Sequence, residues 1–182
     1  GCVIIIPIII VAVLTIVTFK YVKDNDIDIK EYIEESATMK GTIGDTLSSD
    51  DVKITLTDAL IYPRIEGEAF TDTPAEGKEY LVFFFNVENI DDENNFVSIH
   101  NFTGYVDDTL VASKILINNV DNVQYLSADL TPGKKARGYV AYEVDTNWKQ
   151  FDIHYKENSF DYNDSMIFTV VNEENNQNNN NA

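Results

Sequence analysis

Short runs of apolar residues fill the middle of the chain and predict β-strands. Residues 52–57 alternate apolar and polar side chains, which is typical of a strand with one face toward a core and the other toward water. Residues 80–87 form a continuous apolar and aromatic run, which predicts a central strand buried on both faces. Residues 151–156 alternate again and predict a second half-exposed strand.

Further strands are predicted at residues 96–99, 102–106, 110–117, 123–126, 136–144 and 166–171. Asp, Asn, Gly and Pro residues separate these segments, as they do where the chain turns. Many short strands with turn residues between them predict an all-β fold, a sandwich or a barrel.

The beginning of the chain has a different pattern, because residues 3–19 are 17 consecutive positions without a charge. A run this long is near the lower limit for a helix that crosses a bilayer, and it exceeds the usual apolar core of a signal peptide. No small-x-small cleavage pattern follows it, so we expect an uncleaved signal-anchor helix. Gly1-Cys2 does not fit a lipoprotein signal, in which the apolar run precedes the cysteine.

These patterns divide the chain into four parts. We expect a membrane anchor or signal segment at residues 1–23, an acidic spacer at 24–41, a β-sandwich domain at 42–171 and a disordered Asn-rich tail at 172–182. The predicted protein crosses the plasma membrane once, with its domain on the extracytoplasmic side. Cleavage of the first segment would make it a secreted protein.

The charge balance is strongly acidic, with 31 acidic and 13 basic residues and a net charge of -18. This argues against a nucleic-acid partner, since phosphate binding needs clustered Lys and Arg and Lys134-Lys135 is the only adjacent basic pair. The acidic surface favours faster association with cationic partners. The single Cys excludes an internal disulfide framework.

The residues that catalysis needs are sparse. The two histidines, His100 and His154, lie far apart in sequence, and His154 is on the polar side of a predicted strand. No G-x-S-x-G, H-E-x-x-H or G-x-x-x-x-G-K-[ST] motif is present. We therefore predict no enzyme activity, no catalytic residue and no bound organic cofactor.

Acidic loops leave two interpretations open. Oxygen-rich loops at one end of a sandwich suit a Ca²⁺ ion, but Asp and Asn are also the residues that solvated turns require. The candidate Ca²⁺ ligands are Asp91, Asp92, Glu93, Asp107, Asp108, Asp121, Asp161 and Asp164.

Aromatic residues near strand ends also have two interpretations, a binding face or ordinary packing in the core. Tyrosine provides a large contact area at a low entropic cost, which is why interfaces use it. The candidates are Tyr62, Tyr105, Tyr125, Tyr155 and Tyr162.

Two segments carry a family resemblance. Residues 77–89, GKEYLVFFFNVEN, and residues 130–144, LTPGKKARGYVAYEV, resemble the "GK-x-YLV-x-F-x-V-x-N" and "L-x-PGE-x-x-x-GYV-x-FEV" segments of a telokin-like immunoglobulin-fold family of unknown function. The second segment departs from the pattern at Lys134, where Glu is commoner, and at Asp145, where Pro often follows. The family occurs on secreted, lipid-anchored and signal-anchored proteins of Gram-positive bacteria and is related to immunoprotective extracellular antigens.

The resemblance implies an immunoglobulin-like β-sandwich outside the cell and carries no catalytic residue with it. Together with the charge and motif analysis, it predicts a non-catalytic interaction module for a cell-surface protein or an envelope partner. The alternatives are a Ca²⁺-dependent binding domain that uses the acidic loops and an accessory subunit of a surface enzyme or transporter.

Overall fold

The computed structural model describes residues 38–157 and 166–173, which form two five-stranded β-sheets with two short strand pairs beside them. The first sheet contains, in spatial order, β1 (Met39–Gly41), β14 (Met166–Val171), β13 (Gln150–Tyr155), β8 (Phe102–Val106) and β9 (Thr109–Val111). The second contains β10 (Ser113–Lys114), β12 (Lys135–Asp145), β6 (Lys78–Asn89), β3 (Val52–Tyr62) and β2 (Thr46–Ser48). The short pairs are β7 (Asn95–Ser98) with β11 (Ser127–Leu130) and β4 (Ile65–Glu66) with β5 (Thr71–Asp72).

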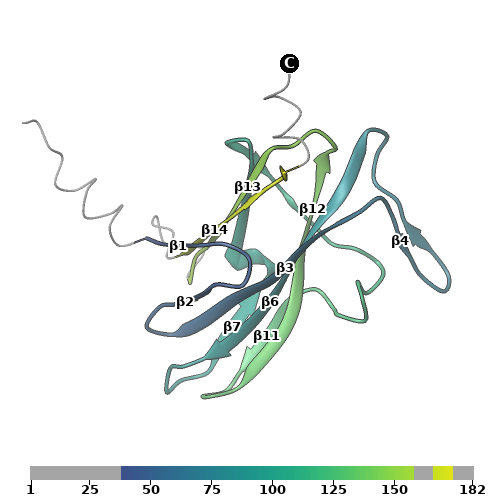
Figure 1. Ribbon diagram of the computed structural model, residues 1–182. Helices are drawn as coiled ribbons and strands as arrows, with labels where there is room; N and C mark the ends of the chain where they lie inside the picture. The colour runs from purple at the N-terminus through teal and green to yellow at the C-terminus, as the bar shows by residue number, and fades with distance from the viewer. Residues whose placement is uncertain (1–37, 158–165, 174–182) are drawn as a thin grey trace, which may run out of the picture. The chain divides into compact units, whose positions relative to one another are not determined.

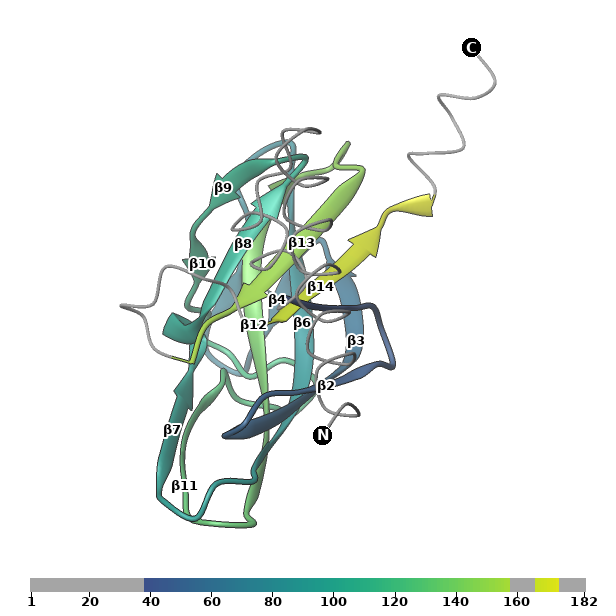
Figure 2. The same ribbon diagram turned by 90° about the vertical axis from the view of Figure 1, so that its left-hand side faces the viewer.

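The two sheets face each other as a sandwich. Figure 1 shows β3, β6 and β12 side by side as the long strands of one layer, and Figure 2 shows β8, β13 and β14 in front of them as the other. Strand β6 pairs antiparallel with both long neighbours over almost its whole length, and β1 pairs parallel with β14. The predicted β-sandwich is thereby confirmed.

The main core fills the space between the sheets. The inward apolar residues of β6, which alternate along the strand as a pleated backbone requires, are almost inaccessible to solvent. Aromatic rings join the two layers: Phe83 lies 4.9 Å from Phe151, and Phe85 lies 4.7 Å from Phe102, between ring centroids. Burial of these rings stabilises the stacking of one sheet on the other.

A second apolar cluster lies on the opposite, outward face of β6 and β12, and we call it the outer cluster. It consists of Tyr80, Val82, Phe84, Tyr139 and Ala141 from the two strands, with Ile65, Leu116 and Val120 from the loops that cover them. This cover explains why residues 80–85 are a continuous apolar run, as the prediction of a central strand buried on both faces required. From Asn86 onward the cover is absent and the outward residues of β6 are polar.

Two of the predicted strands are wrong in detail. Residues 110–117 do not form one strand, because the chain passes from β9 in the first sheet to β10 in the second. Residues 123–126 form only isolated bridges, and the strand of this region is β11, at 127–130. In both segments the apolar residues that suggested a strand include residues that cover the outer cluster instead, such as Leu116 and the partly buried Val123.

The ends of the sandwich differ slightly from the expected domain limits. The first sheet begins at Met39, within the stretch predicted as a spacer, because β1 pairs with β14. The predicted anchor at residues 3–19 and most of the predicted tail lie outside the described residues. No helix in the described part of the chain is long and apolar enough to cross a membrane.

Candidate functional site

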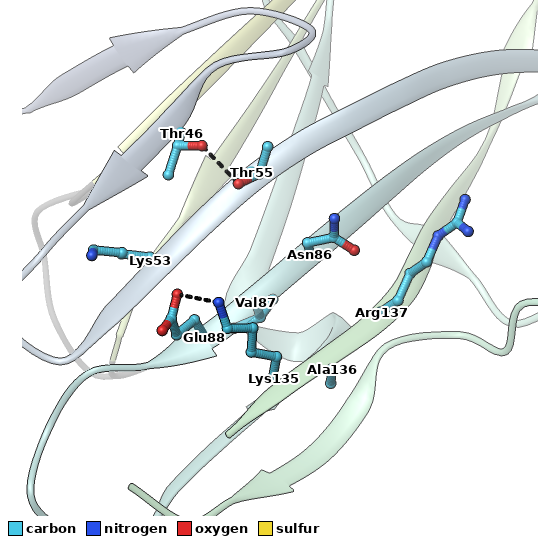
Figure 3. Close-up of a pocket in the computed structure, with 9 residues that line it drawn as sticks. All are labelled: Thr46, Lys53, Thr55, Asn86, Val87, Glu88, Lys135, Ala136 and Arg137. Carbon is cyan, nitrogen blue, oxygen red and sulfur yellow. Dashed lines mark hydrogen bonds and ion pairs between the residues drawn. The ribbon is translucent and has the colours of Figure 1, made fainter. Parts of the chain in front are cut away.

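An open polar depression occupies the part of the second sheet that the outer cluster leaves uncovered. It has a volume of about 480 Å³ and lies across β2, β3, β6 and β12. The residues that line it are Thr46, Lys53, Thr55, Asn86, Val87, Glu88, Lys135, Ala136 and Arg137, and Figure 3 shows their arrangement. We call it the basic depression, since three of its residues are bases and one is an acid.

The strand register places these side chains in two parallel rows. In one row Thr46, Thr55, Asn86 and Arg137 stand opposite one another on successive strands, and in the other Ser48, Lys53, Glu88 and Lys135 do so. Cross-strand partners share a face, and positions two apart along a strand share it too. The pairing of the strands therefore brings together residues that are far apart in sequence.

The charges in the basic depression are only partly compensated. Lys135 Nζ lies 3.0 Å from Glu88 Oε2, so these two charges form an ion pair. Neither Lys53 nor Arg137 has a carboxylate within 4.0 Å among the described residues. Three other bases, Arg64, Lys78 and Lys114, are each paired with an acid elsewhere on the surface. The basic depression thus keeps an excess of positive charge in an acidic domain.

The site has a partly fixed framework. The Arg137 guanidinium carbon lies 5.9 Å from the centre of the Phe84 ring, at the border of the outer cluster. A cation over an aromatic face is attracted to it, and the buried ring cannot move away. On the other side, the Thr46 and Thr55 hydroxyl oxygens are 2.8 Å apart and share a hydrogen bond. Both contacts restrict side chains that face the depression.

A second shallow depression, of about 400 Å³, lies on the outer face of the first sheet. It holds Tyr105 and His154, whose rings are 4.7 Å apart, and Asp152, which accepts hydrogen bonds from Gln150 and Thr169. The Asp152 carboxylate is thus bound to neighbouring side chains and the imidazole packs against a phenol ring. This is the polar side of β13 that the alternation of residues 151–156 predicted.

The acidic candidates of the described residues lie in separate turns. Asp107 and Asp108 form the β8–β9 turn with φ of 45° and 66°, and Asp121 has φ of 50° between the bridged residues Val120 and Val123. Asp and Asn tolerate this left-handed conformation better than most residues. Asp107 also accepts hydrogen bonds from the backbone N–H groups of residues 149 and 150.

The remaining acidic candidates are Asp91, Asp92 and Glu93, which lie together in the loop after β6, and Asp161 and Asp164, which lie outside the described residues. The Asp91 N–H is bound by the side chain of the buried Asn89. Across residues 38–157 and 166–173, no group of three or more His, Cys, Asp or Glu side chains is placed to hold a metal ion.

The aromatic candidates do not gather into one surface. Tyr155 is buried in the main core, and Tyr62 borders the outer cluster and donates a hydrogen bond of 2.6 Å to Asp121 Oδ2. Burial is the main cause that raises the pKa of Tyr62, and the hydrogen bond to Asp121 raises it further. Tyr105 lies in the depression on the first sheet and Tyr125 is 45% exposed near β12. Tyr162 lies outside the described residues.

Sequence reasoning missed the basic depression because its bases are scattered along the chain. Lys53 and Arg137 become neighbours only through the pairing of β3 and β12 with β6. One local signal was present: Asn86 and Glu88 introduce polar positions at the end of the apolar run of β6. This change marks where the cover of the sheet ends and an accessible face begins.

Comparison with known proteins identifies the family of this chain but assigns it no activity. The sequence profile of DUF4352, a domain of unknown function, matches residues 41–177. No protein of the curated set matches the sequence.

Several solved structures with a similar fold come from Gram-positive bacteria. A candidate lipoprotein of Bacillus subtilis, YcdA, has 16% identity and a TM-score of 0.57 over 74% of this chain and 41% of its own. A candidate lipoprotein of Staphylococcus aureus has 17% identity and a TM-score of 0.51 over 71% of this chain and 90% of its own. An uncharacterised β-sandwich protein of Clostridium difficile has 11% identity and a TM-score of 0.50 over 73% and 94%. At these identities the likeness shows the fold alone, and this chain spans less than half of YcdA.

Proposed function

We propose that this chain, which belongs to the DUF4352 family of domains of unknown function, is a non-catalytic binding module on the extracytoplasmic side of the plasma membrane. The observation that carries the proposal is the basic depression, an open and polar sheet face with an excess of positive charge. An open sheet face presents a surface to a partner, whereas catalytic groups typically converge in a pocket that excludes water.

The proposed location has two supports. Residues 3–19 form an uncharged apolar segment long enough for a membrane anchor, and two of the similar structures belong to candidate lipoproteins. A lipoprotein is held at a membrane surface, so a domain of this kind meets other components of the cell envelope. We therefore propose that the ligand is an envelope component and that residues 3–19 keep the domain beside it.

The proposed sandwich is of the immunoglobulin-like, telokin-like type. The two segments that carry that resemblance are the strands β6 and β12 with their preceding turns, and these strands pair along 11 residues at the centre of the second sheet. The glycines of the two turns, Gly77 and Gly133, have φ of +79° and +72°. Only glycine adopts this conformation without strain, so the motif residues have a structural role.

Co-sedimentation with isolated cell envelopes tests this function. The full chain, solubilised in a mild non-ionic detergent, is mixed with washed envelopes of a Gram-positive bacterium at 0.15 M salt, and the bound fraction is measured against concentration. We expect saturable binding that is lost when the chain is first unfolded in urea and kept in it. A wild-type chain that stays in the supernatant at every concentration would overturn the proposal.

A further inference from the structure

We infer that the basic depression binds a phosphate group carried on a hydroxylated compound such as a polyol or a sugar. The inference rests on the proposed function and names the chemistry of its ligand. It starts from the contrast in charge: residues 37–171 contain 23 acids and 10 bases, yet three bases converge on this one face. Such a local reversal of sign has no role in keeping the domain soluble.

The arrangement of the bases fits an anion between them. Lys53 on β3 and Lys135 on β12 stand in the same row with β6 between them, so their backbones are about 10 Å apart. Arg137 stands two positions from Lys135 on the same strand and face. In Figure 3 Lys135 points toward Glu88, whereas the Lys53 and Arg137 side chains extend away from each other on either side of Asn86 and Glu88. Both side chains are long enough to swing over a group placed above these two residues.

The individual donors suit phosphate. A guanidinium group offers a planar fork of N–H donors that matches two oxygens of a phosphate, and an ammonium group supplies a compact point charge beside it. The contact with the Phe84 ring keeps the Arg137 guanidinium on this face of the sheet. Asn86 and the two threonine hydroxyls add neutral hydrogen-bonding groups along the same row.

These neutral groups favour a hydroxylated carrier over an acidic peptide. Protein interfaces depend on aromatic or aliphatic side chains that enter pockets, and the basic depression has none, since Val87 is 1% exposed and Ala136 packs against the core. Its exposed side chains are hydroxyls, an amide and charges. A compound rich in hydroxyl groups can exchange hydrogen bonds with them, whereas an apolar side chain gains nothing there.

Substitution of Glu88 removes a charge from the basic depression but should strengthen binding, whereas loss of a base should weaken it. Its carboxylate stands in the row between Lys53 and Lys135 and is paired with Lys135. A phosphate must displace it or approach against its charge. Replacement by the isosteric amide, Glu88→Gln, frees Lys135 and should strengthen binding.

Titration of the full chain in non-ionic detergent with glycerol phosphate oligomers tests the inference. We expect saturable binding at low salt, at least tenfold weaker for the double variant Lys53→Gln/Arg137→Gln and several-fold tighter for Glu88→Gln. Arg64→Gln is the matched control: Arg64 is paired with Glu66 on β4, outside the depression, so its loss should leave binding unchanged. Thermal unfolding of each variant verifies that the sandwich is intact.

Three further probes identify the source of the phosphate and separate this inference from the proposed function. Inorganic phosphate measures the contribution of the anion alone, and vesicles of phosphatidylcholine with or without phosphatidylglycerol measure binding to a lipid headgroup. Binding to the oligomers or to the anionic vesicles, with the variant pattern above, supports the inference. Stronger binding to polyglutamate, or equal binding by all variants, overturns it. If the chain binds envelopes but not the phosphate compounds, the inference is overturned. The proposed binding module then still stands, with a ligand of another chemical class.

Discussion

Tyr142 presents a case in which removing a polar group should stabilise the protein. Its ring is completely buried in the main core, 4.8 Å from Phe151 and 5.9 Å from Phe83, and its hydroxyl has no hydrogen-bond partner in the part of the chain that the structure describes. Burial raises the pKa of Tyr142, because the charged phenolate is even less compatible with this site than the hydroxyl. Tyr142→Phe removes the oxygen and keeps the ring.

The expected size of the effect follows from two opposing contributions. A buried hydroxyl without a partner costs roughly 1–3 kcal/mol relative to its hydrated state. The variant loses the packing contacts of one oxygen atom, which reduces the gain by up to about 1 kcal/mol. We expect Tyr142→Phe to raise the free energy of unfolding by about 1 kcal/mol and the Tm by about 3–5 °C for a domain of this size.

Tyr139 is the matched control on the same strand. Its hydroxyl donates a hydrogen bond of 3.2 Å to the backbone oxygen of Asn118, and its ring lies in the outer cluster. Tyr139→Phe should therefore lower stability by about 1 kcal/mol. Urea unfolding of the full chain can be followed by the fluorescence of Trp148, the single tryptophan, which is 3% exposed. If Tyr142→Phe destabilises as much as Tyr139→Phe, the Tyr142 hydroxyl has a partner and the reasoning fails.

The remaining predictions concern the core, pH and location. A Cβ at Gly104 would lie 2.5 Å from a Tyr142 ring atom and 2.6 Å from Phe151, so Gly104→Ala should lower stability by about 2–3 kcal/mol in the same urea assay; an unchanged midpoint would contradict the close packing. Burial raises the pKa of Tyr139 to about 12, whereas tyrosines of the unfolded chain titrate near 10, so the contribution of this tyrosine to stability should be constant up to about pH 10 and fall between pH 10 and 12 as the unfolded state loses protons first. The fall in overall stability should be less steep for Tyr142→Phe, and equal slopes would argue that Tyr142 is accessible to base. Protease added to intact protoplasts should remove the sandwich and leave a small membrane fragment, while a protected sandwich would place the domain inside the cell.

The pattern of the sequence identifies the central strands well because their environment is uniform. Residues 80–85 are apolar on both faces since the main core and the outer cluster cover them, and the same strand was predicted from that run. Residues 110–117 and 123–126 were harder, because some of their apolar residues, such as Leu116 and Val123, cover a sheet face from a loop, while Ile115 and Ile117 are exposed. Apolar periodicity reports burial and does not say which element provides it.

The basic depression depends on register, which a single sequence does not contain. Lys53 and Lys135 flank Glu88 only because β3 and β12 pair with β6 at these positions, and a shift of one residue would turn their side chains to the other face. Overall composition does not reveal this face for the same reason. A net charge of -18 favours cationic partners, while the arrangement of the strands creates one face of opposite sign.

Site-specific photocrosslinking in living cells tests most directly that the basic depression contacts an envelope component. Two variants of the chain each carry one photoreactive residue. In the first it replaces Asn86, at the centre of the basic depression. In the second it replaces the partly exposed Ile167, in the depression of the first sheet. We expect an adduct from position 86 that is lost on addition of Lys53→Gln/Arg137→Gln, and no adduct from position 167. Equal adducts from both positions, or an adduct at 86 that survives the loss of both bases, would contradict the account.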